Sequence, residues 1–274
     1  MFTVQKISPG VTHIQDVMGV CMTLIEGDRE AILIDAGYGI EDVSGFVRTL
    51  TERPVRLILT HGHHDHILGA RWFPRSWLHP ADQEEFLLRT GGPQRERVAD
   101  QAGQKGIPIP EDFMTARIPA PEPLELNDRL GSFPCARLDP GRKEAWIIHV
   151  PGHTPGSVVC FLPEEELLLT GDDWNPCTWL WFPSSVAIRE WKARMTELLR
   201  TLEETTGKPV ARVLCSHQPG VREGAELYDY LNEVTEESIR NARPVDMNSP
   251  IETCQIRFSR PEWTLVFDQK KGFC

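Results

Sequence analysis

Six consecutive residues, HGHHDH at positions 61–66, constrain this chain more than any other part of the sequence. They follow the run VRLIL over 55–59, which is apolar apart from Arg56 and is predicted to form a buried strand. Histidine offers neutral nitrogen and aspartate offers hard oxygen, a mixture that suits Zn²⁺ and is also acceptable to Fe or Mn. Three buried imidazoles beside one carboxylate cannot satisfy one another, so a bound cation explains the cluster. On a loop at a strand end, His61 and His63 would point to one metal, and Asp65 and His66 to a second.

Three further predicted strands end in residues that can bind metals. His153 follows the strand over 145–150, Asp172 follows 166–170, and His217 follows 211–215. Metal ligands and catalytic groups collect on loops at one edge of a rigid sheet. The sequence therefore predicts that these loops supply the remaining ligands.

Composition limits the partners. The 274 residues include 40% hydrophobic and 25% charged residues, which is ordinary for a globular protein long enough to bury a core. The net charge of −11 repels phosphate backbones and anionic lipid, so nucleic acid is not an expected partner. No apolar run approaches the about 20 residues that a membrane span needs, and the N-terminus lacks the apolar core of a signal peptide. The expectation is a cytoplasmic protein with a small-molecule substrate; exposed aromatic residues would permit a homodimer without requiring one.

The seven cysteines form no CxxC pair, and their number is odd. A disulfide framework is therefore not expected, which agrees with a reducing compartment. Most of these thiols should be buried as small hydrophobic groups, and Cys177 is the one left open.

Element order follows from periodicity and turn signals. The predicted strands cover 3–7, 11–17, 21–26, 31–34, 55–59, 145–150, 157–162, 166–170, 211–215, 255–258 and 263–267. The predicted helices cover 41–51, 81–89, 94–102, 188–204 and 223–240. Proline density between 103 and 142 prevents long regular elements, so 81–142 is interpreted as an insertion that packs over one side of the domain.

Taken in order, HxHxDH at 61–66, then His153, Asp172 and His217, with Asp35 in LIDAG, resemble the metallo-β-lactamase-fold hydrolase superfamily over roughly residues 10–220. This resemblance implies an α+β fold, an αββα sandwich of two mixed sheets flanked by helices. It implies a single domain over 1–274, with the insertion at about 81–142 and a C-terminal extension of a helix and strands at about 223–274.

The resemblance also assigns the ligands of a dinuclear site. One metal would be held by His61, His63 and His153, and the other by Asp65, His66 and His217. Asp172 would bridge the two, with Asp173 as the alternative bridging ligand, and Asp35 would support the histidine loop from behind.

The expected activity follows from this arrangement. Two divalent metals, Zn by preference, share a water and lower its pKa, which gives a hydroxide nucleophile at neutral pH. The catalytic Asp65 would orient that water and shuttle a proton. The expected substrate is a small ester, thioester, lactone or phosphoester. The aromatic segment over 174–182 either packs in the core or lines the substrate pocket, with Trp174, Asn175 and Trp179 as candidates for the pocket.

Several subfamilies fit the residues less well. True metallo-β-lactamases usually have Cys or Ser in place of Asp172, and quorum-signal lactonases have Tyr in place of Asn175. Glyoxalase II enzymes carry a basic C-terminal domain, whereas the tail here is acidic. Flavodiiron proteins replace the second histidine of HxHxDH with Glu and need a flavodoxin domain. Nuclease members would need a basic face, which the negative net charge opposes. Two alternatives to a hydrolase stay open: a metal-bound sensor or binding protein with little turnover, and an iron-dependent redox enzyme.

Overall fold

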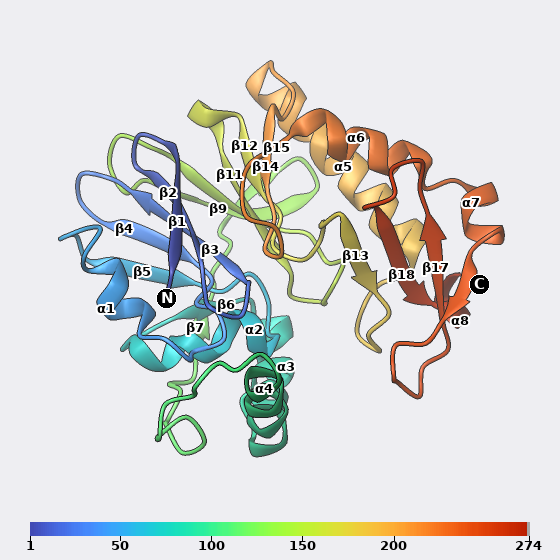
Figure 1. Cartoon of the computed structure of the whole chain (residues 1–274). Coiled ribbons are helices and arrows are strands. Elements are labelled where there is room, and N and C mark those ends of the chain that lie inside the picture. The colour runs from blue at the N-terminus through green and yellow to red at the C-terminus, as the bar shows by residue number, and fades with distance from the viewer. Residues whose placement is uncertain (273–274) are drawn as a thin grey trace. The chain divides into compact units, whose positions relative to one another are not determined.

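The computed structural model, drawn in Figure 1, describes residues 1–272. These residues form two compact units. The first unit contains Met1–Glu125, Arg137–Ala145 and Ser216–Gly220. The second contains Leu126–Ala136, Trp146–Cys215 and the residues from Val221 onward. Cys274, one of the seven cysteines, lies outside the described residues. The prediction of a single domain stays a prediction.

The first unit is built on a mixed sheet of seven strands in the order β1 to β7. Strands β1 to β4 pair antiparallel, and β4 to β7 pair parallel. The strands are β1 Thr3–Ser8, β2 Val11–Gln15, β3 Cys21–Glu26, β4 Ala31–Ile34, β5 Val55–Ile58, β6 Trp77–Leu78 and β7 Glu122–Pro123. Every residue of β4 is buried, as expected for an apolar central strand.

Four helices belong to the first unit: α1 Val43–Val47, α2 His64–Ile67, α3 Gln83–Arg89 and α4 Gly92–Gln104. The helix predicted over 41–51 is shorter than expected, because it begins after the capping carboxylate of Asp42 and ends within about one turn. Val43 and Val47 of α1 share the buried core of the first sheet. The two helices predicted in the insertion are confirmed as α3 and α4.

The second sheet has seven strands in the order β15-β14-β12-β11-β10-β9-β8 and lies mostly in the second unit. Its strands are β8 Asp128–Leu130, β9 Phe133–Leu138, β10 Ala145–His149, β11 Val158–Leu162, β12 Leu167–Leu169, β14 Arg212–Leu214 and β15 Arg222–Glu223. It is mixed, since β12 and β14 run parallel while β10, β11 and β12 alternate in direction.

A third, four-stranded sheet in the order β13-β18-β17-β16 completes the second unit. The strands predicted over 255–258 and 263–267 are confirmed as β17 and β18, whereas β13, β16 and the sheet that they form were not predicted. Its strands are β13 Cys177–Leu180, β16 Arg243–Val245, β17 Thr253–Arg257 and β18 Thr264–Asp268. Strand β13 pairs parallel with β18, so the aromatic segment is joined to the C-terminal residues.

Helices α5 Ile188–Thr206, α6 Gly224–Glu233, α7 Glu236–Arg240 and α8 Gln269–Gly272 belong to the second unit. In Figure 1, α5 and α6 lie side by side. The single helix predicted over 223–240 is wrong, because the chain breaks at Val234 and restarts with a capping box at Thr235. Leu198 and Leu202 of α5 are buried in one core with the second sheet.

Two mixed sheets with helices confirm the predicted α+β class. Among residues 1–272, no helix is both long enough and apolar enough to cross a membrane.

Candidate metal centre

The parallel pairing of β4 and β5 places Asp35 beside the start of the histidine loop. Ile34 and Ile58 are paired at the ends of these strands, and Asp35 and Thr60 follow them. Asp35 accepts the Thr60 backbone N–H at 2.7 Å and the Thr60 hydroxyl at 2.8 Å. The same carboxylate accepts Nδ1–H of His66 at 2.8 Å. Asp35 therefore fixes both ends of the loop, and its φ of +65° is the left-handed conformation that Asp tolerates better than most residues.

Thr60 passes this orientation on to His61. Nδ1 of His61 lies 3.0 Å from the Thr60 hydroxyl oxygen. Because that hydroxyl donates its proton to Asp35, the imidazole is the donor in its contact with Thr60. His61 thus carries its proton on Nδ1 and presents Nε2 as the atom that can bind a metal.

His63 is oriented by helix α3 of the insertion. Its Nε2–H donates to Glu85 at 3.1 Å, and both side chains are largely buried. The pKa of Glu85 is lowered from 4.5 to about 2, first by this hydrogen bond and then by the ion pair with Arg89. Gly62 permits the close approach, because a Cβ there would lie 3.0 Å from Glu85 Cβ and from the backbone of α3. Nδ1 of His63 is therefore the nitrogen that can bind a metal.

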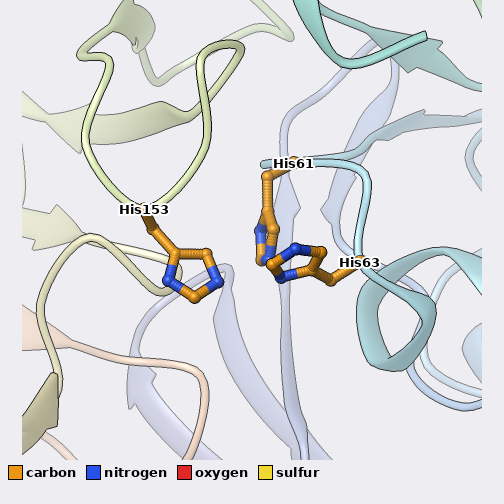
Figure 2. Close-up of side chains that lie close together, drawn as sticks. All are labelled: His61, His63 and His153. Carbon is orange, nitrogen blue, oxygen red and sulfur yellow. The ribbon is translucent and has the colours of Figure 1, made fainter. Parts of the chain in front are cut away.

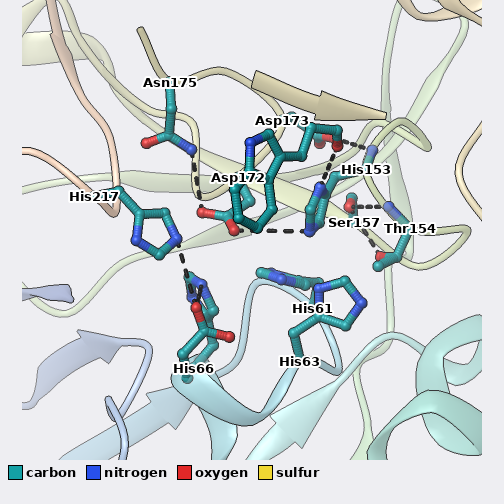
Figure 3. A network of polar contacts seen from close by, with 12 residues as sticks. His61, His63, His66, His153, Thr154, Ser157, Asp172, Asp173, Asn175 and His217 are labelled. Carbon is teal, nitrogen blue, oxygen red and sulfur yellow. Dashed lines mark hydrogen bonds and ion pairs between the residues drawn. The ribbon is translucent and has the colours of Figure 1, made fainter. Parts of the chain in front are cut away.

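Asp65, His66 and His217 form a second group within the first unit. Figure 3 shows His66 and His217 of this group. One ligand atom of each lies within 4.8 Å of the other two. Oδ2 of Asp65 lies 3.6 Å from Nε2 of His66 and 3.5 Å from Nε2 of His217. The His217 loop is held by β3, where the Cys21 backbone N–H donates to the Ser216 carbonyl at 2.7 Å.

His153 in the second unit is held from three directions. Its backbone N–H donates to Asp173 at 2.7 Å, and its Nδ1–H donates to the Trp179 carbonyl at 2.7 Å. Its own carbonyl accepts the Ser185 hydroxyl at 2.7 Å. The loop lies tightly against Asp173, since a Cβ at Gly152 would be 2.4 Å from that carboxylate. The imidazole of His153 is drawn in Figure 2 together with those of His61 and His63 from the first unit.

Asp172 lies beside His153, with 3.6 Å between its Oδ2 and the Nε2 of that histidine. The side-chain amide of Asn175 donates to the other carboxylate oxygen of Asp172 at 3.2 Å, as the dashed line in Figure 3 marks. Asp173, the alternative bridging ligand, instead places a carboxylate oxygen on the backbone of the His153 loop.

The donor set fits divalent cations. His61, His63, His66 and His153 each use one ring nitrogen in an outer hydrogen bond, so the other nitrogen carries the lone pair. A tetrahedral cation with bonds of about 2.0–2.2 Å sets neighbouring ligand atoms about 3.3–3.6 Å apart. The spacings of 3.5 and 3.6 Å within each unit match that edge, and they are longer than an ordinary hydrogen bond.

Each unit thus brings together its own share of the predicted ligands. The first unit holds His61 with His63, and Asp65 with His66 and His217; the second holds His153 with Asp172.

Among the pocket candidates, Trp174 is fully buried and packs edge-on against Tyr230, which favours the interpretation that it belongs to the core. Trp179, by contrast, is 40% exposed.

Thr60, Glu85 and Cys21 support the ligands but were missed in the sequence. Thr60 precedes the motif directly, so its position at the strand end was the available signal. Glu85 lies in the insertion and Cys21 on a distant strand, and nothing in the sequence connects either residue to the ligand that it supports.

The sequence and the fold are similar to those of known proteins. The model of the metallo-beta-lactamase superfamily matches residues 16–217. The chain is 27% identical over 170 residues to acyl-coenzyme A thioesterase MBLAC2 of Gallus gallus, covering 56% of this chain and 60% of that protein. It is 27% identical over 156 residues to hydroxyacylglutathione hydrolase GloC of Haemophilus influenzae, covering 56% and 65%. Each match thus spans less than two thirds of the relative's length. The structure of the sec-alkylsulfatase Pisa1 from Pseudomonas sp. has a TM-score of 0.61 at 16% identity, covering 85% of this chain and 41% of that one, which shows the fold alone.

Proposed function

The chain belongs to the metallo-beta-lactamase superfamily, and on this premise we propose that it is a dinuclear metal-dependent hydrolase that cleaves a small acyl thioester. The arrangement of Asp65, His66 and His217 carries the proposal, because it supplies two nitrogens and a carboxylate oxygen at metal-ligand spacing. Thioesters are preferred among the bonds considered because one relative is named for acyl-coenzyme A and another for hydroxyacylglutathione.

We further propose that the two half-sites combine. One cation would be held by His61, His63 and His153 and the other by Asp65, His66 and His217, and Asp172 would contribute a carboxylate ligand. Support comes from the superfamily match, which runs from 16 to 217 and includes ligands of both units. It also favours a single catalytic domain. Zinc suits a ligand set of three nitrogens and also a mixed set of nitrogen and oxygen ligands. Fe and Mn are the alternative metals.

The bound cations would lower the pKa of a water and polarise the substrate carbonyl. The protein's own groups then orient and move protons. Asp65, whose side chain is only 11% exposed, takes the proton of the attacking water. The water oxygen forms the new C–O bond, the C–S bond breaks, and the proton passes to the leaving thiolate. Asp35 and Glu85 keep the histidines from rotating during this sequence.

The test is a substrate panel on protein loaded with zinc, iron or manganese. It contains an acyl-coenzyme A thioester, a lactone, a carboxyl ester and a phosphodiester, each run beside Asp65→Asn and the control Asp100→Asn. Asp100 is an exposed carboxylate on α4. Thioester turnover should fall by about 10²-fold or more in Asp65→Asn and persist in the control. Two bound metals with no turnover of any thioester would refute the thioesterase assignment and favour the binding protein.

Metal content tests the joining of the half-sites. Wild type should hold two metals per chain by mass spectrometry, and His153→Ala should hold about one after dialysis against a weak chelator. Full metal content in His153→Ala would show that the second unit contributes no ligand at this position.

A further inference from the structure

Strand β13 and the two residues that follow it carry three aromatic side chains at the edge of the third sheet. Thr178 and Leu180 are buried, whereas Cys177 and Trp179 are exposed, which is the alternation of a strand with one face in the core. Trp179 is 40% exposed, and Trp181, the next residue but one, is half-buried. The sheet order leaves β13 at the edge, with β18 as its neighbour.

Three rings form one continuous apolar surface that reaches His153; we call Trp179, Trp181 and Phe182 the aromatic surface. The ring centroids of Trp179 and Trp181 are 6.0 Å apart, and Trp181 stacks on Phe182 at 4.3 Å. Phe182 meets the imidazole of His153 edge-on at 5.1 Å. Contiguous exposed aromatic groups beside a polar site are typical of ligand binding.

The aromatic surface is held in place before any ligand arrives. Nζ of Lys271 donates to the carbonyls of Phe182 at 3.2 Å, Pro183 at 2.7 Å and Ser185 at 2.6 Å. Strand β18 pairs with all four residues of β13. A surface fixed in this way loses little conformational entropy on binding, which favours affinity.

The chemistry of this surface selects an apolar group. Lys271 directs its ammonium to three backbone carbonyls and is not available to a phosphate. Arg189, at the start of α5, is bonded to the Glu236 carboxylate and to the Gly272 carbonyl. The aromatic surface therefore matches an uncharged hydrocarbon better than the phosphates of a nucleotide carrier.

We propose that the aromatic surface binds the hydrocarbon chain of the acyl group. The protein would then act on medium and longer acyl thioesters in preference to acetyl thioesters. This specificity rests on the proposed function, because His153 as a metal ligand is what places the reacting carbonyl next to these rings. Each methylene buried against them should raise kcat/KM about fourfold.

The kinetic test compares acetyl, butanoyl and octanoyl thioesters, each carried by coenzyme A and by N-acetylcysteamine. For wild type, kcat/KM should be at least about 50-fold higher for octanoyl than for acetyl, given about three buried methylenes. Trp179→Ala should bring that ratio close to one, and Trp179→Phe should keep most of it. Val221→Ala removes another exposed apolar side chain, which is 37% exposed, and should leave the ratio unchanged. Metal content should stay constant in Trp179→Ala, because the acceptor for His153 is a backbone carbonyl.

A binding test separates this inference from the proposed function. Calorimetry on metal-free protein should show octanoate binding about tenfold or more tighter than butanoate, with a negative heat-capacity change that Trp179→Ala removes. If no thioester is hydrolysed, the proposed function is refuted. The octanoate titration would still show whether the aromatic surface binds a hydrocarbon chain. A length preference that persists in Trp179→Ala would overturn the inference. So would a Trp179→Ala defect that depends on coenzyme A and not on acyl length, since it would place the adenine on these rings.

Discussion

Removing the Glu85 carboxylate should weaken metal binding without unfolding the protein. Glu85 accepts Nε2–H of His63 at 3.1 Å, and the two side chains are 16% and 5% exposed. A hydrogen bond to a charged group contributes about 1.5–3 kcal/mol, and loss of an outer partner of a metal-bound histidine costs about 10–100-fold in affinity. At about 1.4 kcal/mol per factor of ten the two scales agree. Glu85→Ala should therefore lower the affinity for the cation held by His63 by about 10–100-fold.

The graded variant separates charge from geometry. Glu85→Gln keeps an oxygen that can accept from His63 but loses the charge, so its affinity should fall by only about 3–10-fold, the difference between a charged and a neutral hydrogen bond. Arg89 also binds Glu85, with 2.7 Å between Nη2 and Oε1. Arg89→Met should consequently have a smaller effect than Glu85→Ala.

The assay is a Zn²⁺ titration of metal-free protein against a chromophoric chelator of known affinity. Glu84→Ala is the matched control, because Glu84 is the exposed neighbour on the same helix. Circular dichroism and urea denaturation without metal confirm that each variant folds. Zinc affinity in Glu85→Ala equal to that in Glu84→Ala would refute the argument that α3 orients His63.

Two further changes test the first unit. Asp35→Asn should lower the free energy of unfolding by about 1–3 kcal/mol in urea denaturation, because a buried amide cannot accept from both Thr60 and His66, and unchanged stability would contradict this network. For His13, burial lowers the pKa from 6.5 to about 4. The unfolded chain therefore binds its proton at a higher pH than the folded chain does, so the stability contributed by neutral His13 is complete above about pH 6.5 and is lost as pH falls toward 4. Urea denaturation of metal-free protein gives the free energy of unfolding at pH 7 and at pH 4.5. The drop between these two values should be about 2–3 kcal/mol smaller in His13→Gln than in wild type. An equal drop in both proteins would refute the lowered pKa of His13.

The positions of the candidate ligands could be predicted to lie at strand ends because each follows a largely apolar run. Strand β5 is apolar apart from Arg56, so a local pattern was enough to place the HGHHDH loop at a strand end. The role of Asp35 was expected only from the resemblance, and the parallel pairing of the buried strand β4 with β5 puts it beside that loop. The supporting contact from Glu85 could not be predicted. It depends on how α3 folds back onto the loop at Gly62, and no periodicity reports a contact between two elements.

The aromatic segment shows why composition alone was ambiguous. Its residues take opposite roles within a few positions: Trp174 is fully buried against Tyr230, whereas Trp179 is exposed on β13. Only the strand alternation of β13 separates the two, and that strand exists because β18 pairs with it from the far end of the chain. A pairing across more than eighty residues leaves no local signal.

The C-terminal residues therefore contribute to the proposed site although the superfamily match ends at 217. Strand β18 fixes β13, whose Trp179 carbonyl accepts the Nδ1–H of His153. Lys271 fixes the following turn, whose Ser185 hydroxyl donates to the His153 carbonyl. Both connections end on the same histidine, one on its ring and one on its backbone. Chains that share the ligands but differ after 217 would hold this histidine by other means, and their acyl specificity should differ with the aromatic segment that the C-terminus supports.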